Sequence, residues 1–192
     1  MKKIILFLLL IFARCSIYCS KQYNKEVRIT FVRCNNFPVK YLKETQIQLE
    51  QYLYKEFNII AMIEWDDYSE YINSKERIKG IDVINKFKNN LFPTTVVFIP
   101  DDIEYNKKGV LGLSVHPNNN VCVVSTYRLK NKSNLWKLVA HEFIHTYFDY
   151  SHCPLDCDTC IMKDAKGKVN FNNKNKLCNY CKHILNLTKF NF

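Results

Sequence analysis

The chain has 192 residues and a formal net charge of +10. A chain of this length can bury one hydrophobic core, and it contains no repeats or low-complexity linkers that would divide it into several domains. The positive net charge favours acidic partners such as polyanions or anionic membrane surfaces. The basic residues are spread from Lys21 to Lys189 without a dense stripe, and solvated, lysine-rich faces are the commoner explanation of such a charge.

The first twenty residues have the pattern of a secretory signal. Lys2-Lys3 forms a basic start, and Ile4 to Ala13 forms an apolar core that is too short to span a membrane. We therefore predict a signal peptide at residues 1–20, a mature domain at residues 21–192, and export. A short membrane anchor that stays in place is the alternative, and lipid attachment at one of the two cysteines of this segment is a weaker one.

The predicted elements follow from the spacing of apolar residues. Alternation or a short apolar run indicates a strand, whereas apolar residues three and four apart indicate a helix. The prediction is a strand at 27–32, a helix at 39–57, a strand at 58–65, a helix at 74–90, a buried strand at 94–99, and two strands at 111–115 and 121–126 joined by a turn at 116–120. This mixed order points to one α+β or three-layer domain.

A longer helix is predicted between Ser133 and Ser151, a stretch without proline or glycine. Its apolar residues form one stripe: Leu135, Leu138, Val139, Phe143 and Ile144. Asn131 or Ser133 can cap its start, because a short oxygen-bearing side chain accepts hydrogen bonds from the first free backbone N–H groups.

This helix carries the most informative motif of the chain, His141-Glu142-Phe143-Ile144-His145. His141 and His145 are four residues apart, so both imidazoles lie on one helix face and can reach one zinc ion. Glu142 flanks that metal position, where a base acting on water belongs. A helix with two half-buried histidines is the plain alternative.

Cysteines gather beyond this helix: Cys153, Cys157 and Cys160 precede the pair Cys178 and Cys181. Two pairs of thiolates suit a tetrahedral zinc site with no open position, and such a site is structural. A disulfide cluster is the alternative in an exported protein. Cys34 and Cys122 fit two buried thiols as well as they fit a disulfide.

Together the motifs resemble the archaemetzincin signature, in the segments HEFIH (141–145), His152-Cys153, Cys160-Ile161-Met162 and Cys178-Asn179-Tyr180-Cys181. Archaemetzincins are zinc-dependent metallopeptidases of the metzincin clan. The resemblance implies an α+β fold with a single metzincin-like catalytic domain, a twisted mixed sheet, an active-site helix and a zinc-tied C-terminal segment. Residues 111–126 would then form the rim that pairs with substrate, although an ordinary hairpin is an equal alternative.

The resemblance also assigns residues to two zinc ions. The catalytic zinc would be held by His141, His145 and His152, with Glu142 as general base. Met162 would be the Met-turn residue beneath this site. The second, structural zinc would be held by Cys153, Cys160, Cys178 and Cys181.

The sequence departs from the family pattern in the segment that follows the helix. Six residues separate His145 from His152, where the family usually has five, and Phe148 occupies the place of a glycine. Glycine suits that place because the chain leaves the helix in a left-handed conformation. We therefore predict that the turn moves to Asp149, Tyr150 or Ser151. The additional Cys157 could replace Cys160 as a zinc ligand.

The expected function is hydrolysis of peptide bonds by a zinc-activated water, with Glu142 as the proton acceptor. A catalytically inactive, zinc-stabilised binding protein with the same fold is the alternative. The expected partner is a peptide or protein substrate. We expect no nucleic acid, no stable membrane span after removal of the signal, and a monomer.

Overall fold

The computed structural model describes residues 26–34, 37–53, 56–88, 94–115, 119–164 and 171–185. The predicted signal segment, residues 1–20, lies outside the described residues, as do residues 116–118 of the predicted turn. None of the helices in the described ranges has both the length and the apolar character that crossing a membrane requires.

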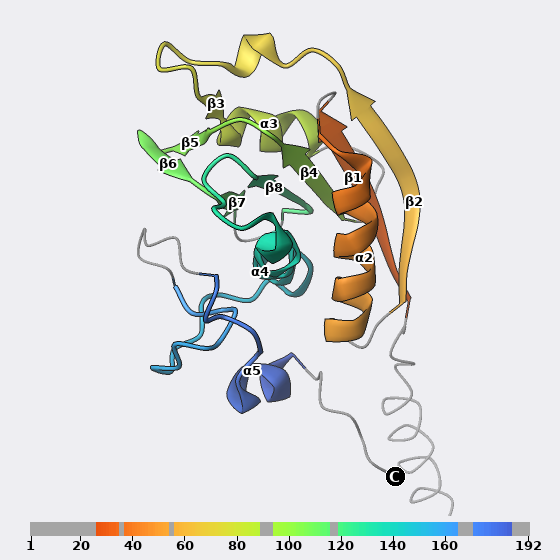
Figure 1. Ribbon diagram of the computed structural model, residues 1–192, viewed down its shortest axis with the longest axis vertical. Helices are drawn as coiled ribbons and strands as arrows, with labels where there is room; N and C mark the ends of the chain where they lie inside the picture. Colours follow the sequence, from red (N-terminus) through yellow and green to blue (C-terminus); the bar gives the residue numbers. More distant parts are fainter. Residues whose placement is uncertain are drawn as a thin grey trace, which may run out of the picture.

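A five-stranded sheet forms the centre of the fold (Figure 1). In spatial order its strands are β2 (Glu56–Trp65), β1 (Glu26–Cys34), β4 (Thr95–Ile99), β8 (Val121–Ser125) and β7 (Gly112–Ser114). The first four run parallel, whereas β7 pairs antiparallel with β8 at one edge. The predicted mixed sheet is thus confirmed.

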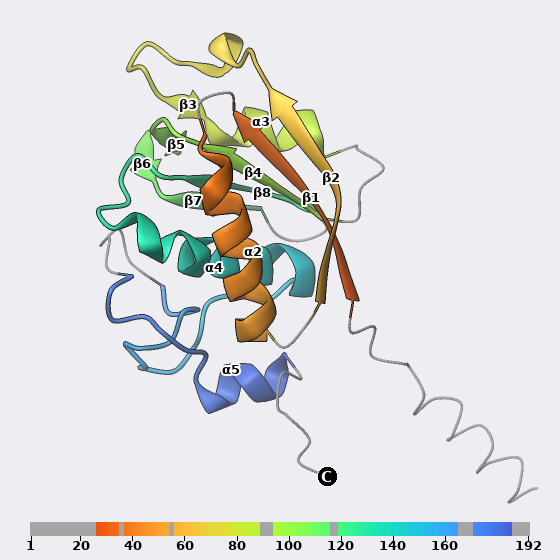
Figure 2. The same cartoon turned by 45° about the vertical axis from the view of Figure 1, so that its right-hand side comes forward.

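Helices cover both faces of this sheet. The helices α2 (Val39–Leu53) and α4 (Leu135–Phe148) lie on one face, and α3 (Gly80–Phe87) lies on the other (Figure 2). Strand β1 contributes to the hydrophobic core on each face of the sheet. Phe31 packs in the core that contains α2 and α4, and Val32 packs in the core that contains α3. The predicted α+β architecture in three layers is confirmed.

The chain beyond α4 passes beneath that helix and leads to α5 (Asn179–Ile184) (Figure 1). Backbone hydrogen bonds hold its turns together. The N–H of Cys153 donates to the carbonyl oxygen of Met162 at 2.7 Å. The N–H of Ile161 donates to the carbonyl oxygen of Lys176 at 2.8 Å. Segments distant in sequence are thereby fixed side by side below α4.

The helix predicted at 74–90 is shorter than expected, because α3 begins only at Gly80. The Asn73 side chain accepts hydrogen bonds from the backbone N–H groups of Lys75 and Arg77, at 2.8 and 3.1 Å, and Glu76 has a positive φ of 57°. This local turn takes up the groups that a helix would use. The residues after it form β3 (Ile78–Lys79) instead.

Two further boundaries differ from the prediction. Helix α2 ends at Leu53 rather than at Phe57, because Glu56 and Phe57 already pair with β1. The hairpin of β5 (Ile103–Tyr105) and β6 (Lys108–Val110) was not predicted. Its turn places Asn106 and Lys107 at φ of 49° and 64°, and it lacks the glycine that usually marks such a turn in a sequence. With β3 these strands form a second, three-stranded sheet.

Candidate metal centres

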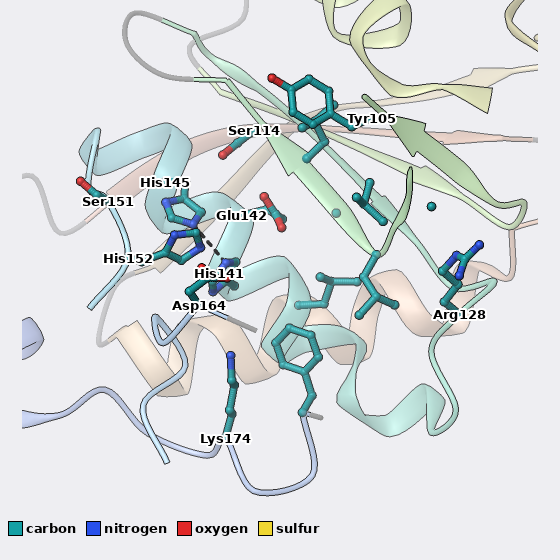
Figure 3. Close-up of a pocket in the computed structure, with 17 residues that line it drawn as sticks. Tyr105, Ser114, Arg128, His141, Glu142, His145, Ser151, His152, Asp164 and Lys174 are labelled. Atoms are coloured by element: carbon teal, nitrogen blue, oxygen red, sulfur yellow. Dashed lines mark hydrogen bonds between the residues drawn. The ribbon is translucent and has the colours of Figure 1, made fainter. Parts of the chain in front are cut away.

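Packing orients α4 so that its polar motif faces a cleft. Asn131 caps the short 3-10 helix Lys132–Asn134 that leads into α4, and its side-chain oxygen accepts from the N–H of Ser133 at 3.0 Å. The predicted apolar stripe is buried in the core that α4 shares with α2 and the sheet. The motif residues His141, Glu142 and His145 line the cleft on the other side of the helix (Figure 3).

His141 and His145 point their Nε2 atoms at each other, 3.0 Å apart. The Nδ1 of His141 lies 2.8 Å from the carbonyl oxygen of Ile161. The Nδ1 of His145 lies 2.6 Å from the carbonyl oxygen of Tyr150. A carbonyl only accepts hydrogen bonds, so both Nδ1 atoms carry the hydrogen and both Nε2 atoms present lone pairs.

These lone pairs fit a shared metal ion. Two nitrogen lone pairs that face each other repel unless a cation lies between them, and the backbone carbonyls are the usual partners that orient ligating imidazoles. Burial lowers the pKa of His141 well below its ordinary value, so this imidazole is neutral near pH 7. A neutral imidazole is the form that binds zinc.

The third histidine, His152, reaches the same position from the segment after α4. Asp149 ends the helix with φ 50° and ψ 40°, so the predicted left-handed turn lies at the first of the three expected positions. The ring of His152 then lies 5.2 Å from that of His141 and 4.7 Å from that of His145, between centroids. The ligand atoms of these three residues, which we name the His cluster, all lie within 4.8 Å of one another.

Glu142 lies beside the His cluster and is buried between α4 and the edge strand β7. Burial raises the pKa of Glu142 to about 8, and a hydrogen bond with Ser114 opposes this rise. The backbone of Gly112 passes so close that a Cβ at this position would lie 2.6 Å from the Cγ of Glu142. A bound cation would favour the charged carboxylate.

Four cysteines form a second group below α4: Cys153, Cys160, Cys178 and Cys181, which we name the Cys cluster. Their sulfur atoms all lie within 4.8 Å of one another, and all four are free thiols. The Sγ atoms of Cys153 and Cys178 are 3.6 Å apart, and those of Cys160 and Cys181 are 3.8 Å apart. Sulfur atoms at the corners of a tetrahedral zinc site lie about 3.8 Å apart, given a Zn–S bond of about 2.3 Å. The spacing therefore fits zinc.

Cys157 lies outside this cluster. Its Sγ contacts the hydroxyl of Thr159 at 3.7 Å, whereas the Sγ of Cys160 accepts a hydrogen bond from the N–H of Cys178 at 3.5 Å. The geometry thus brings Cys160 rather than Cys157 to the group. Cys34 and Cys122 are buried free thiols on β1 and β8, so a disulfide between them is not formed.

Comparison with known proteins identifies the fold. No protein-family model matches the sequence, and no curated protein is similar to it in sequence. Archaemetzincin from Methanopyrus kandleri superposes with a TM-score of 0.71 at 15% identity, over 86% of this chain and 97% of that one. The chain has the archaemetzincin fold.

Two further solved structures share it. A zinc-dependent peptidase from Methanocorpusculum labreanum gives a TM-score of 0.66 at 20% identity, over 82% of this chain and 99% of that one. Archaemetzincin from Archaeoglobus fulgidus, complexed with malonate, gives a TM-score of 0.65 at 16% identity, over 82% of this chain and 99% of that one. The expected resemblance is confirmed at the level of the fold.

In this archaemetzincin fold the His cluster opens into a cleft of about 510 Å³ between β7 and the C-terminal segment. Residues 109–114 form one wall, and Phe171 and Lys174 form the opposite wall. The predicted rim was too broad: of its two strands β7 lines the cleft, whereas β8 is fully buried between β4 and β7, and residues 116–118 between them lie outside the described residues. Met162 is buried next to Ile161, whose carbonyl oxygen orients His141.

Several cleft residues were missed by sequence reasoning: Tyr105, Arg128, Asp164, Phe171 and Lys174. Gly112 and Ser114 lie within the predicted rim, but their closeness to Glu142 was not predicted. One signal for this close approach was present, since the whole chain has only four glycines, and Gly112 lies within the predicted strand 111–115 while Gly109 lies just before it. A glycine in a strand often marks close approach of a backbone to another group. The other residues come from segments whose approach depends on tertiary packing.

Proposed function

We propose that the protein is a zinc-dependent peptidase. The observation that carries this proposal is the convergence of three imidazoles and a buried carboxyl group, Glu142, in one open cleft. The likeness in fold to proteins named archaemetzincin and zinc-dependent peptidase supports it. The residues that would hold the catalytic zinc are His141, His145 and His152.

The chain's own groups divide the work of hydrolysis. A zinc ion in the His cluster would polarise the scissile carbonyl and lower the pKa of a water molecule. Glu142 would accept the proton of the attacking water and then deliver it to the leaving amine. The Ser114 hydroxyl and the backbone of Gly112 hold the Glu142 side chain in place.

The edge strand β7 gives the substrate a place to bind. One side of β7 pairs with β8, and its residues line the cleft beside Glu142. An extended peptide can pair with such an edge through backbone hydrogen bonds. We therefore propose that the substrate is a peptide or an extended segment of a protein, laid along β7 with its scissile bond at the His cluster.

The Cys cluster would hold a second zinc ion with a structural role. Four thiolates fill all positions of a tetrahedral ion and leave none for water or substrate. His152 and Cys153 are consecutive, so one peptide unit joins the two sites. The hydroxyl of Tyr150 also contacts the Sγ of Cys181 at 3.4 Å. The second zinc would thus fix the segment that delivers His152.

Replacement of the base tests the proposed function. Glu142→Ala should keep its zinc content, because Glu142 is not one of the clustered ligands. Hydrolysis of a peptide library should fall by about 100-fold or more, given that positioned acid–base groups contribute about 10²–10⁴-fold. Zinc is measured by native mass spectrometry and cleavage by mass spectrometry of the products.

Glu44→Ala is the matched control, because Glu44 is an exposed carboxylate on α2 outside the cleft. It should cleave at the rate of the parent protein. Unchanged cleavage by Glu142→Ala would contradict the assigned role. A parent protein that binds zinc and cleaves no peptide would instead favour a binding protein with the same fold.

A further inference from the structure

Lys174 is a buried cation on the cleft wall opposite β7. Only 6% of its surface is exposed, although burial of an ammonium group is costly unless the charge is compensated. Within the described ranges, the hydrogen-bond acceptor of its Nζ is the carbonyl oxygen of Lys163. The Nζ also lies 5.4 Å from the ring centroid of Phe171. One carbonyl and one ring leave donor capacity in an ammonium that has three N–H groups.

The segment that carries Lys174 is fastened to α4. Lys137 donates a hydrogen bond from its Nζ to the carbonyl oxygen of Phe171 at 3.0 Å. Asn134 donates from its Nδ2 to the Oδ1 of Asn172 at 2.7 Å. The ring of Phe171 also packs near that of His141, with centroids 6.3 Å apart. The ammonium is therefore held at a defined place relative to the His cluster.

The side chain of Lys174 extends from this segment toward His141 and Asp164 (Figure 3). Burial lowers the pKa of Lys174, while the charges of Asp164 and Cys160 oppose that effect. Arg128, the other strong cation of the cleft wall, is engaged by both carboxylate oxygens of Asp102, at 2.6 and 2.7 Å. Lys174 is thus the cation of the described cleft that faces the His cluster without a bidentate carboxylate partner.

We propose that Lys174 binds a carboxylate of the substrate, carried by a residue next to the scissile bond. This inference rests on the proposed peptidase function and names its substrate class. The carboxylate comes either from an Asp or Glu side chain or from the C-terminus of a short peptide, and both offer the same chemistry to an ammonium. Leu138 and Phe171 line the same part of the cleft and contact the apolar atoms of that residue.

A purely structural role predicts different behaviour. Lys174 would then only link its segment to Lys163 and balance the charges of Asp164 and Cys160. In that case, its loss would weaken the binding of all peptides equally. A substrate contact instead predicts a loss that is confined to peptides with a carboxylate.

Binding to the full-length, zinc-loaded Glu142→Ala protein tests this, because this background separates binding from cleavage. Calorimetry compares matched tetrapeptides: a free C-terminus against a C-terminal amide, and Glu against Gln in amidated peptides. We expect one carboxylate form to bind about 10–100-fold more tightly than its neutral partner, as a hydrogen bond between charged groups would give. The pair that shows the difference identifies the source of the carboxylate.

Three further substitutions are made in the same background. Lys174→Met should abolish the preference and leave the affinity for neutral peptides within about threefold, and Lys174→Arg should retain most of the preference. Lys43→Met is the matched control, since Lys43 is an exposed lysine on α2 outside the cleft, and it should keep the preference. Zinc content is recorded for each protein.

Three results would overturn the proposal. They are equal binding of acidic and neutral peptides, no measurable binding of any peptide, and a carboxylate preference that survives in Lys174→Met. The comparison of peptides with and without a carboxylate uses the Glu142→Ala protein alone, so it can be made even if a Lys174 variant fails to fold. Cleavage by the protein with Glu142 intact is measured in parallel. A carboxylate preference in binding without any cleavage would refute the peptidase function while supporting the Lys174 site.

Discussion

Gly112 gives Glu142 the space that it occupies. The edge strand must pass close to Glu142 if an extended substrate on β7 is to reach the His cluster, and a residue without a side chain allows that approach. The arrangement ties the position of the proposed base to the position of the substrate strand. A change at Gly112 should therefore affect catalysis before it affects metal binding.

We predict that Gly112→Ala keeps zinc in both sites but lowers kcat by about tenfold or more. The added Cβ would lie 2.6 Å from the Cγ and 2.7 Å from the Cδ of Glu142, so the carboxyl group must move, and small misplacements of catalytic groups are costly. Steady-state kinetics on a cleaved peptide measures the effect.

Gly80→Ala is the control for Gly112→Ala, because its Cβ would meet first the flexible end of the Leu113 side chain, at 3.0 Å. It should retain nearly full activity. If Gly112→Ala were as active as the parent protein, Glu142 would not be held by the approach of β7.

At the scale of elements, the C-terminus of α4 determines whether His152 can join the other two ligands. Phe148 is the last helical residue, and the left-handed conformation falls on Asp149. Asp tolerates this conformation better than a bulky residue does. This explains how the chain turns without the glycine that the family usually has.

We predict that Asp149→Gly is more stable than Asp149→Ala by about 1 kcal/mol, because Gly adopts positive φ without the steric cost of a Cβ. Urea unfolding of the two zinc-loaded variants measures the difference. Equal stability of the two variants would show that the turn does not need the left-handed conformation at this position.

The cleft wall formed by β5 and β6 depends on an ion pair. Asp102 precedes β5, and its side chain is 8% exposed. The hydrogen bond from Arg128 lowers the pKa of Asp102 below its usual value, against the effect of burial, and Arg77 contributes a second cation at 3.0 Å. Since the folded-state pKa is the lower one, this stabilisation is present above the unfolded pKa of about 4 and is lost as the pH falls through the folded value.

Asp102→Asn should accordingly lower the free energy of unfolding by about 1–3 kcal/mol at pH 7, the range for lost hydrogen bonds to charged groups. The difference from the parent protein should begin to shrink as the pH falls below about 4, where Asp102 of the unfolded chain becomes protonated, and should be smallest below the lower folded-state pKa, where Asp102 of the folded parent is protonated as well. Zinc loss at low pH affects both proteins, so the comparison isolates Asp102. A pH-independent difference in thermal unfolding would contradict this role.

For the molecule as a whole, the parts that the sequence predicts are those fixed by local periodicity. The spacing of His141 and His145 places both on one helix face, and the apolar run at 94–99 corresponds to the buried central strand β4. The β5–β6 hairpin and the wall residues Tyr105 and Lys174 could not be predicted, because their positions depend on contacts between distant segments. The helix predicted at 74–90 begins late, at Gly80, because hydrogen bonds to the Asn73 side chain hold residues 75–77 in a local turn despite the helical spacing of the apolar residues.

We propose that this chain binds two separate zinc ions, at sites joined through the consecutive residues His152 and Cys153. Native mass spectrometry of the purified protein measures the zinc stoichiometry of the parent, of His152→Ala and of Cys178→Ser. We predict two zinc ions in the parent and one in each variant, because each substitution removes a ligand from only one cluster. One zinc in both the parent and His152→Ala, or two in both, would show that His152 is not a required ligand and would contradict the account.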